Sequence, residues 1–539
     1  MRAWWQSLRV TYLSVDPRSL GLFRILFGLV LLLDLGRRWS ELGVWYANSG
    51  LLPNHTLLWR PPAGRTFSLF FTVSSVSEAH VAFVLCGLVY LMFILGYRTP
   101  WAQLLTLLAR VSLNTRLAVL ENGGDMVMDL LCVFTLLLPL GTRFSIDAVA
   151  VAKRDGLPSG EVPEWARRPV VSLAMLGLVL QFAAIYFFNA ISKSGPAWRD
   201  GSAVHFALHQ DKLVTWLGVW MREQLPVPML RLLTRVTLAT EWTGFLLIIT
   251  PVFVSQSRLL AVCAMPLLHL GFGLGLNLGG FSPAMMSFFA LLLAANDWDA
   301  LARRFGPRVL RLRQAAERAA LFLLRHARPP AVAQPWFWRR ILTEAGAVLL
   351  ILAVASEALN DNNSVPQALR VKQPAWAKAV IEYPRILQGW RMFASDPPRG
   401  DSMIYVEAMT AAGARVDPYN QVASDQHYPA GTVVPTHMGQ SQYFVMYSER
   451  IPNVSYAAYR QAFSEWLVAY PERTGRAEDC LLSYEVYLVT DQSPAIGERD
   501  AKPLSRQSFM TYRAPRDGTC KPLKSPPETP RARNDTPVH

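Results

Sequence analysis

The stretch SLGLFRILFGLVLLLDLG (residues 19–36) decides the fold, because it is almost wholly apolar over 18 residues. Only Arg24 and Asp34 within it are charged. A helix of about 20 mainly apolar residues crosses the hydrocarbon core of a bilayer, so this stretch is predicted to be a transmembrane helix. Similar runs follow at 79–96, 101–119, 126–141, 170–190, 229–251, 258–276, 280–296 and 341–356. The sequence therefore predicts an all-α multispan membrane bundle of about nine transmembrane helices.

The overall composition favours the same class of protein. Of the 539 residues, 52% are hydrophobic and 17% are charged, whereas soluble domains carry roughly 25% charged residues. The net charge of +14 lies entirely before residue 357, because residues 1–356 hold 33 Lys and Arg against 19 Asp and Glu, and the remainder holds 20 against 20. A basic excess confined to the apolar part argues against a nucleic-acid partner and predicts contact with membrane lipids.

The distribution of Lys and Arg among the short loops predicts the orientation. The N-terminal tail and every second loop after it are predicted to lie on the same side of the membrane. Together they hold 20 basic residues against eight acidic ones. Basic loops stay in the cytoplasm. We therefore expect a multi-pass protein of the cell inner membrane, with a cytoplasmic N-terminus and a periplasmic, extracytoplasmic C-terminal domain. Residues 301–340 are predicted to form a basic amphipathic cytoplasmic segment, lying either on the inner leaflet or in solvent as a loop helix.

The chain is predicted to divide into five parts. These are a transmembrane bundle (1–300), the basic amphipathic segment (301–340), a last transmembrane helix (341–356), an extracytoplasmic α+β domain (357–520) and a disordered tail (521–539).

Within the α+β domain, short runs of β-forming residues predict strands, and one amphipathic run predicts a helix. The strands are expected at 403–408, 443–447 and 481–488, and the helix at 455–470. This domain holds two of the five cysteines, Cys480 and Cys520. In an oxidising compartment they either form one disulfide or remain free.

A lysine at the end of an apolar helix is the first candidate functional residue. Lys193 follows the predicted span 170–190 by three residues, just before Gly195 and Pro196, which stop the helix. Asn189 and Trp198 flank it. If the Lys193 amine is partly desolvated, its neutral form could accept a proton from a weakly acidic substrate. Alternatively, its side chain reaches the lipid phosphates at the interface.

Glu241 and His269 are the next candidates, because ionisable groups inside predicted spans are costly and mark functional sites. They could pair, relay protons or bind a polar headgroup, or they could form structural hydrogen bonds between helices. Asn277 follows in the same region, and Arg24 and Asp34 lie too far apart along their helix to pair with each other.

Two further patterns are weaker. His205 and His209 lie four residues apart, on one helix face, and are weak candidates for metal ligands, although we predict no metal. The alternative is an interfacial amphipathic helix over 202–222. The polar turn at 121–125 carries two carboxylates, which could serve in acid–base chemistry or simply form a turn.

Taken in order, several motifs resemble the vitamin K-dependent gamma-carboxylase-like family, whose bacterial members are called horizontally transferred transmembrane domain (HTTM) proteins. The matching motifs are Ser19–Gly28, Glu121–Asp125, Ile191–Lys193 with Trp198–Gly201, His269–Gly271 with Asn277 and Gly280–Ser282, and Gly389–Pro398. The resemblance implies that Lys193 is the base that deprotonates a reduced quinone, with Asn189, Trp198 and Asn277 as cofactor-binding residues.

The chain also departs from that family. The turn before the fourth predicted span reads Asn122, Gly123 and Gly124, where the carboxylases carry a catalytic histidine. The lumenal portion that binds a substrate propeptide is much reduced, so carboxylation of glutamate is not expected. A second branch, the sporulation-delaying-type toxin maturation proteins, is similar in layout and acts on a secreted peptide.

Two functions follow from these observations. The first is a quinone-linked or peptide-modifying enzyme that uses Lys193, Glu241 and His269 near the outer membrane face. The second is a non-catalytic maturation or binding protein for a secreted peptide or a lipid. In the second, the segment around Trp390 docks the external domain on the bundle.

Overall fold

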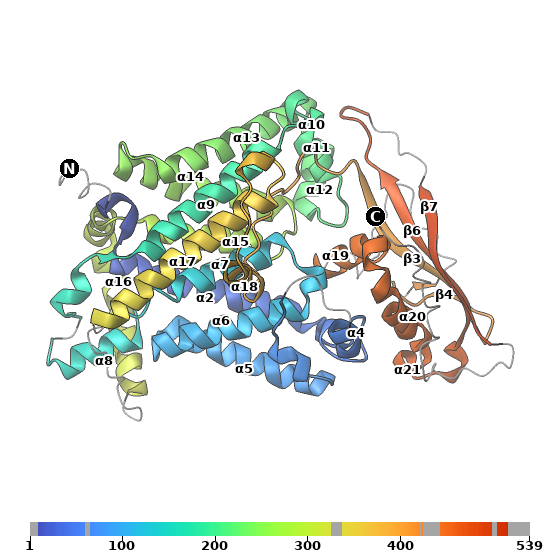
Figure 1. Cartoon of the computed structure of the whole chain (residues 1–539), viewed down its shortest axis with the longest axis horizontal. Helices are drawn as coiled ribbons and strands as arrows, with labels where there is room; N and C mark the ends of the chain where they lie inside the picture. Colours follow the sequence, from blue (N-terminus) through green and yellow to red (C-terminus); the bar gives the residue numbers. More distant parts are fainter. Residues whose placement is uncertain are drawn as a thin grey trace, which may run out of the picture.

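The computed structural model describes residues 9–59, 65–158, 160–324, 337–420, 422–423, 442–498 and 504–515. A large group of helices forms one part of the molecule, and a twisted sheet with short helices forms the other (Figure 1). The first described element, η1 (Arg9–Leu13), lies at the end of the helical part that is far from the sheet. The described fold is thus mainly helical, with a small antiparallel sheet contributed by the C-terminal region.

Six helices of the described residues are long and apolar enough to cross a membrane. They are α2 (Pro17–Trp39), α5 (Val76–Leu95), α9 (Leu173–Ser192), α13 (Val227–Ile249), α14 (Val254–Gly275) and α17 (Phe337–Asp361). Each coincides with one of the predicted spans. The structure therefore agrees with the prediction of a multi-pass membrane protein.

The other three predicted spans are also helical, but they are shorter or more polar. They correspond to α6 (Thr99–Arg116), α7 (Gly123–Thr135) and α15 (Phe281–Phe288) continued by η5 (Phe289–Leu292). The 13 residues of α7 extend over about 20 Å, which is less than the roughly 30 Å of hydrocarbon. The number of nine spans therefore stays a prediction.

Helix ends are placed by specific capping residues. Asn122 accepts hydrogen bonds from the backbone N–H groups of Gly124 and Asp125, and the Asp125 carboxylate reaches back to the N–H of Asn122. This capping box starts α7. Helix α9 ends at Ser192, because Pro196 soon follows and begins the short helix α10 (Pro196–Asp200). Lys193 is therefore the residue that caps the C-terminus of α9.

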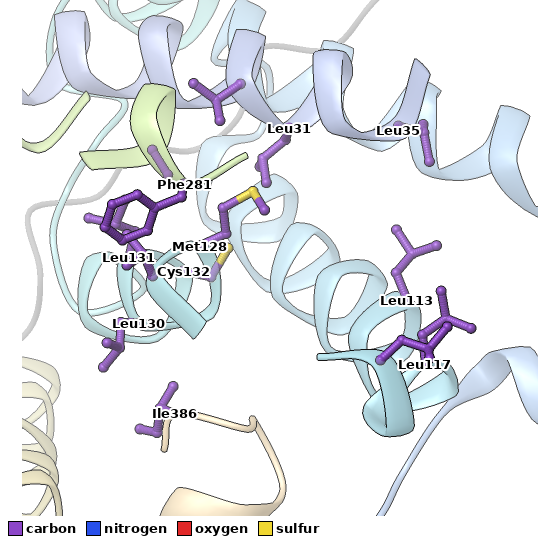
Figure 2. Close-up of a cluster of buried hydrophobic side chains, with 14 of the residues drawn as sticks. Leu31, Leu35, Leu113, Leu117, Met128, Leu130, Leu131, Cys132, Phe281 and Ile386 are labelled. Atoms are coloured by element: carbon purple, nitrogen blue, oxygen red, sulfur yellow. The ribbon is translucent and has the colours of Figure 1, made fainter. Parts of the chain in front are cut away.

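The bundle core forms where apolar faces of several helices meet. Leu31 of α2, Leu113 of α6, Met128 of α7 and Phe281 of α15 belong to one buried cluster (Figure 2). Helix α9 lies beside α13 and α17. Burial of these side chains is the main favourable term that holds the helices in this arrangement.

The two ends of the bundle differ. Helices α8 (Ile146–Arg154) and α16 (Ala295–Leu323) lie at the end of the bundle that is far from the sheet, and α10, α11 (Ala203–Leu208) and α12 (Trp216–Gln224) lie near the sheet (Figure 1). Helix α16 covers the first part of the predicted basic amphipathic segment, and residues 325–336 lie outside the described residues. Whether α16 contacts lipid stays a prediction.

The C-terminal region contains a five-stranded antiparallel sheet in the order β5-β4-β3-β6-β7. Its strands are β3 (Gly400–Thr410), β4 (Arg415–Asp417), β5 (Val422–Ala423), β6 (Leu481–Gln492) and β7 (Ser505–Arg513). Its helices include α19 (Gln442–Arg450), α20 (Arg460–Val468) and α21 (Tyr470–Thr474). Strands were expected at 403–408 and 481–488 and a helix at 455–470, and the structure has these elements.

The strand predicted at 443–447 is wrong, because these residues lie in α19. Phe444 and Tyr447 both face the ring of Trp45, with ring centroids 4.7 and 5.6 Å away. Residues three apart share a helix face but point to opposite faces of a strand. The contact with Trp45 therefore decides the conformation.

The cysteines also differ in state. Cys86, Cys132 and Cys263 are free, and Cys480 is disulfide-bonded. Cys520, one of the two cysteines for which a disulfide or a free thiol was expected, lies outside the described residues, as does the tail 521–539.

Candidate functional site

The structure brings Lys193 and Glu241 together. Lys193 Nζ lies 2.6 Å from Oε1 and 2.5 Å from Oε2 of Glu241, so α9 and α13 are joined by a two-pronged ion pair. Both residues are buried, with 6% of each accessible. Each charge therefore has its counter-charge at hydrogen-bond distance in a poorly solvated position, which is the condition under which a buried pair is retained.

Trp198 and Asn189 complete the surroundings of Lys193. The Nζ atom lies 5.1 Å from the centre of the Trp198 ring, within the range of a cation–π interaction. The Trp198 indole N–H donates to the carbonyl oxygen of Phe393 at 3.0 Å, and Asn189 Oδ1 accepts from the backbone N–H of Met392 at 2.9 Å. Both predicted binding residues thus contact a segment that follows them by about 200 residues.

Residues 389–398, which we call the covering segment, pack against the helix ends beside Lys193. The backbone N–H of Gly195 donates to Ser395 O at 3.1 Å, and that of Ala197 donates to Asp396 Oδ1 at 2.9 Å. Asp396 therefore supplies the N-terminal cap of α10 from a distant part of the chain. A Cβ at position 195 would lie 2.2 Å from Asp396 Oδ1, so a larger residue there would displace the Asp396 carboxylate.

His269 contacts α9 about two helical turns away from Lys193. Its Nε2 atom lies 2.6 Å from the hydroxyl of Tyr186, and its buried Nδ1 atom has no hydrogen-bond partner in the described part of the chain. Tyr186 precedes Lys193 by seven residues on α9, which corresponds to about 10 Å along the helix. The structure thus pairs His269 with Tyr186 rather than with Lys193 or Glu241. Tyr186 was not predicted as a site residue, although residues seven apart lie on the same face of a helix two turns from each other.

The remaining predicted residues lie elsewhere. Asn277 follows α14, where its Oδ1 accepts from Arg37 Nη2 at 2.6 Å. The His205 and His209 rings lie 4.1 Å apart. His205 Nε2 donates to Pro494 O at 2.9 Å, and His209 Nδ1 donates to His205 O at 2.8 Å.

Burial lowers the pKa of His205, and it lowers the pKa of His209 to about 4. Both rings are therefore neutral at physiological pH. The described residues contain no group of three or more His, Cys, Asp or Glu that could hold a metal ion.

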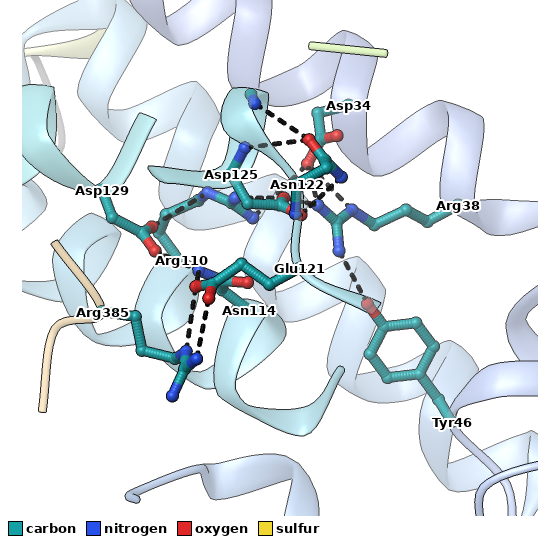
Figure 3. A network of polar contacts seen from close by, with 11 residues as sticks. Asp34, Arg38, Tyr46, Arg110, Asn114, Glu121, Asn122, Asp125, Asp129 and Arg385 are labelled. Atoms are coloured by element: carbon teal, nitrogen blue, oxygen red, sulfur yellow. Dashed lines mark hydrogen bonds and ion pairs between the residues drawn. The ribbon is translucent and has the colours of Figure 1, made fainter. Parts of the chain in front are cut away.

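A second buried cluster was not predicted as a unit. Arg38 Nη2 lies 2.8 Å from both Asp34 and Asp125, and Arg110 lies 2.5 Å from Asp125 and 3.2 Å from Asp129 (Figure 3). These side chains come from α2, α6 and α7 and are nearly inaccessible to solvent. The sequence shows charges of opposite sign in neighbouring predicted spans, which indicates that some of them pair. Which ones pair depends on how the helices are rotated about their axes.

Glu121 connects this cluster to the C-terminal region. Arg385 donates two hydrogen bonds to its carboxylate, at 2.9 and 2.7 Å (Figure 3). Arg450 of α19 donates to the backbone carbonyls of Glu121 and Val119. The carboxylates of the turn 121–125 are thus engaged in ion pairs. Arg24, for which a separate partner was expected, donates to backbone carbonyls that include those of Leu140 and Phe144.

The six apolar spans and the buried ionic groups between them define a multi-pass membrane protein. A family model described as the HTTM domain matches residues 12–298, which is more than half of the chain. The chain therefore belongs to the HTTM-domain family, in agreement with the resemblance to gamma-carboxylase-like proteins. No curated protein and no solved structure matches it.

Proposed function

We propose that the protein is a membrane enzyme in which the Lys193–Glu241 pair removes a proton from a reduced quinone near the outer face of the bundle. The observation that carries this proposal is the direct contact of the Lys193 ammonium with the Glu241 carboxylate in a buried position. Membership of the HTTM family supports it, because the resemblance implies a base at Lys193.

The pair can take up one proton without creating an unbalanced buried charge. The ammonium of Lys193 passes a proton to Glu241, and the resulting amine accepts the proton of a quinol hydroxyl. The pair then consists of a protonated carboxyl and an ammonium, and the quinol becomes a monoanion that stays beside that cation and balances its charge. Trp198 stabilises the ammonium through its ring.

The described residues contain groups suited to a quinol. The buried Nδ1 atom of His269 has no hydrogen-bond partner among them, so its hydrogen-bonding capacity is unused. We keep Trp198, Asn189 and Asn277 as the proposed binding residues, and Trp198 is the one in contact with Lys193. A reduced quinone is therefore the proposed cofactor or substrate, with Lys193, Glu241 and His269 as the proposed catalytic residues.

Turnover of a reduced quinone in purified membranes tests this proposal. We expect Lys193→Met to lower turnover by at least about a hundredfold, because general-base catalysis contributes that much or more. The exposed Lys372→Met is the matched control and should retain turnover. Unchanged turnover in Lys193→Met, with the protein still monodisperse in detergent, would remove Lys193 from the mechanism.

We further propose that the N-terminus is cytoplasmic and that the C-terminal α+β region is periplasmic, in the inner membrane of a bacterial cell. The basic loops support this orientation. Labelling with an impermeant thiol reagent in a Cys263→Ala background tests it. Val454→Cys, at a site where Val454 is 83% exposed, should react from outside intact cells, whereas Arg311→Cys should not. The reverse pattern would contradict the orientation.

A second candidate function is a non-catalytic maturation or binding protein for a secreted peptide or a lipid. The hydrogen bonds of the covering segment to Asn189, Gly195 and Trp198 support it, because this function requires the C-terminal region to dock on the bundle. In that case a chain ending at Ser356 would not complement a deletion strain, whereas Lys193→Met would complement fully. Loss of complementation by Lys193→Met would support the enzyme instead.

A further inference from the structure

Helix α16 combines a high positive charge with an exposed surface. Residues 300–323 hold six arginines and one acidic residue, Glu317. The Glu317 carboxylate is already engaged, because it accepts a hydrogen bond from the backbone N–H of Gly160 at 3.2 Å. The helix therefore carries an excess of positive charge that its own acidic residue does not balance.

Both ends of α16 are held against the bundle. At its N-terminal end, Trp298 Nε1 donates to Ser19 Oγ at 2.8 Å. At its C-terminal end, Ala320 belongs to a buried apolar cluster with Ile146 of α8. The arginines lie between these two contacts, so the fold keeps them at a fixed place on the bundle.

The neighbouring elements place α16 at a surface of the membrane. It begins three residues after the end of η5, which is buried in the bundle, and the spanning helix α17 follows it in the chain. It lies at the end of the bundle that is far from the sheet (Figure 1). A helix with six arginines is too costly to cross the hydrocarbon core. We therefore expect α16 to lie along the surface of the bilayer.

An apolar row lies on one exposed face of α16. Leu301, Phe305 and Leu323 are separated by four and 18 residues, so they share one face of the helix. Their exposed fractions are 40%, 39% and 49%. Large apolar side chains in such a row are unfavourable in water and favourable at the boundary between lipid headgroups and acyl chains.

A basic row runs beside the apolar row. Arg304, Arg311 and Arg318 follow one another at intervals of seven residues, or about two turns, and all three are exposed. The guanidinium carbon of Arg304 lies 5.8 Å from the centre of the Phe305 ring, so the two rows are adjacent. When the apolar row faces the acyl chains, the long arginine side chains beside it reach the level of the lipid phosphates.

We propose that α16 binds the headgroups of anionic phospholipids, with its apolar row at the acyl boundary and its basic row on the lipid phosphates. The planar guanidinium group presents two parallel N–H donors that match phosphate oxygens. The apolar row favours a lipid surface over a nucleic acid, because nucleic-acid phosphates would leave that row in water. This surface is separate from Lys193 and does not depend on the proposed quinone chemistry.

Fluorescence of the full chain in lipid nanodiscs tests the proposal. In a Cys263→Ala background, the environment-sensitive dye NBD is attached at Ala316→Cys, an exposed position about three turns after Phe305. Gln314→Cys, which is exposed on the opposite face, is the matched control for position. We expect the label at position 316 to emit at a shorter wavelength in an equal mixture of phosphatidylcholine and phosphatidylglycerol than in phosphatidylcholine alone. The label at position 314 should not respond to the lipid mixture.

Removal of the basic row should remove the response to anionic lipid. Replacing its three arginines by glutamine should reduce the shift at position 316 at least about fivefold, because each arginine near an anionic surface contributes about a fivefold preference. The control Arg370→Gln, Arg415→Gln, Arg513→Gln removes the same charge from exposed positions of the C-terminal region. It should keep the full shift.

If the chain without the basic row does not fold, Arg311→Gln alone replaces it. This variant should need at least about twice the fraction of phosphatidylglycerol for half of the shift. Equal emission in the two lipid compositions, or an unchanged response after loss of the arginines, would overturn the proposal. A shift of the same size on addition of RNA to phosphatidylcholine nanodiscs would also overturn it, because the basic row would then be a nucleic-acid surface.

Discussion

The two buried charge clusters of this protein are built in opposite ways. In the cluster around Asp125, each guanidinium contacts more than one carboxylate, as Arg38 contacts both Asp34 and Asp125. In the other cluster, Lys193 and Glu241 pair one to one. The first joins three helices and, through Glu121 and Arg385, the C-terminal region, whereas the second joins only α9 and α13.

This difference indicates which cluster is suited to holding the helices together and which is suited to proton transfer. Protonation of one carboxylate in the Asp125 cluster would disturb several ion pairs at once, so its charges are suited to holding helices in place. A single pair can gain one proton while no third group loses a partner. The first cluster is therefore suited to holding helices together, and the second is the pair for which we propose proton transfer.

The largest effect is expected from breaking the shared carboxylate. Asp125→Asn removes a charge that compensates both Arg38 and Arg110. We expect a loss of about 4 kcal/mol in the free energy of unfolding, because two buried cations lose part of their compensation. Thermal unfolding in detergent measures this loss. Asp155→Asn, in an exposed pair with Arg154, is the control and should change stability by less than about 0.5 kcal/mol.

The isolated pair should behave differently when one or both partners are removed. Lys193→Met alone should cost about 3 kcal/mol, because Glu241 is left as an unpaired buried charge. The double variant Lys193→Met, Glu241→Gln should recover most of that loss, since no charge remains. A double-mutant cycle measures the coupling. If the double variant were as unstable as the two single variants combined, the pair would not be an isolated unit.

A smaller effect is expected at the covering segment. Asp396→Ala removes the side chain that caps α10 at the N–H of Ala197. We expect a loss of about 1 kcal/mol, as for other helix caps. Asp396→Asn keeps an acceptor oxygen and should lose less. Because α10 carries Trp198, the same substitution should also lower quinol turnover more than it lowers the amount of folded protein.

The smallest effect concerns pH. Burial lowers the pKa of His209 to about 4, below the value near 6.5 that is ordinary for histidine. The unfolded chain then binds more protons between these values, so stability is complete above about pH 6.5 and falls as pH decreases toward 4. We expect about 1 kcal/mol, after allowing for partial solvent screening. The free energy of unfolding, measured from pH 7 to pH 4.5, should depend less on pH in His209→Gln than in the unaltered protein.

The apolar runs in the chain were sufficient to locate the helices, because a span through lipid must satisfy its backbone internally and cover about 30 Å. Each of the nine predicted runs contains a helix, and six of these helices meet the length and hydropathy of a span. The position of Lys193 at the end of α9 also followed from local chemistry, since Gly195 and Pro196 interrupt the helix. These features depend on residues close together in the sequence.

Pairing between distant residues could not be read in the same way. Glu241 lies 48 positions after Lys193, and His269 meets Tyr186 across 83 positions. Which partner a buried charge finds depends on the rotation and depth of each helix, and these are set by packing of the whole bundle. The sequence shows that Lys193 and Glu241 are costly to bury, and only the tertiary structure decides that they compensate each other.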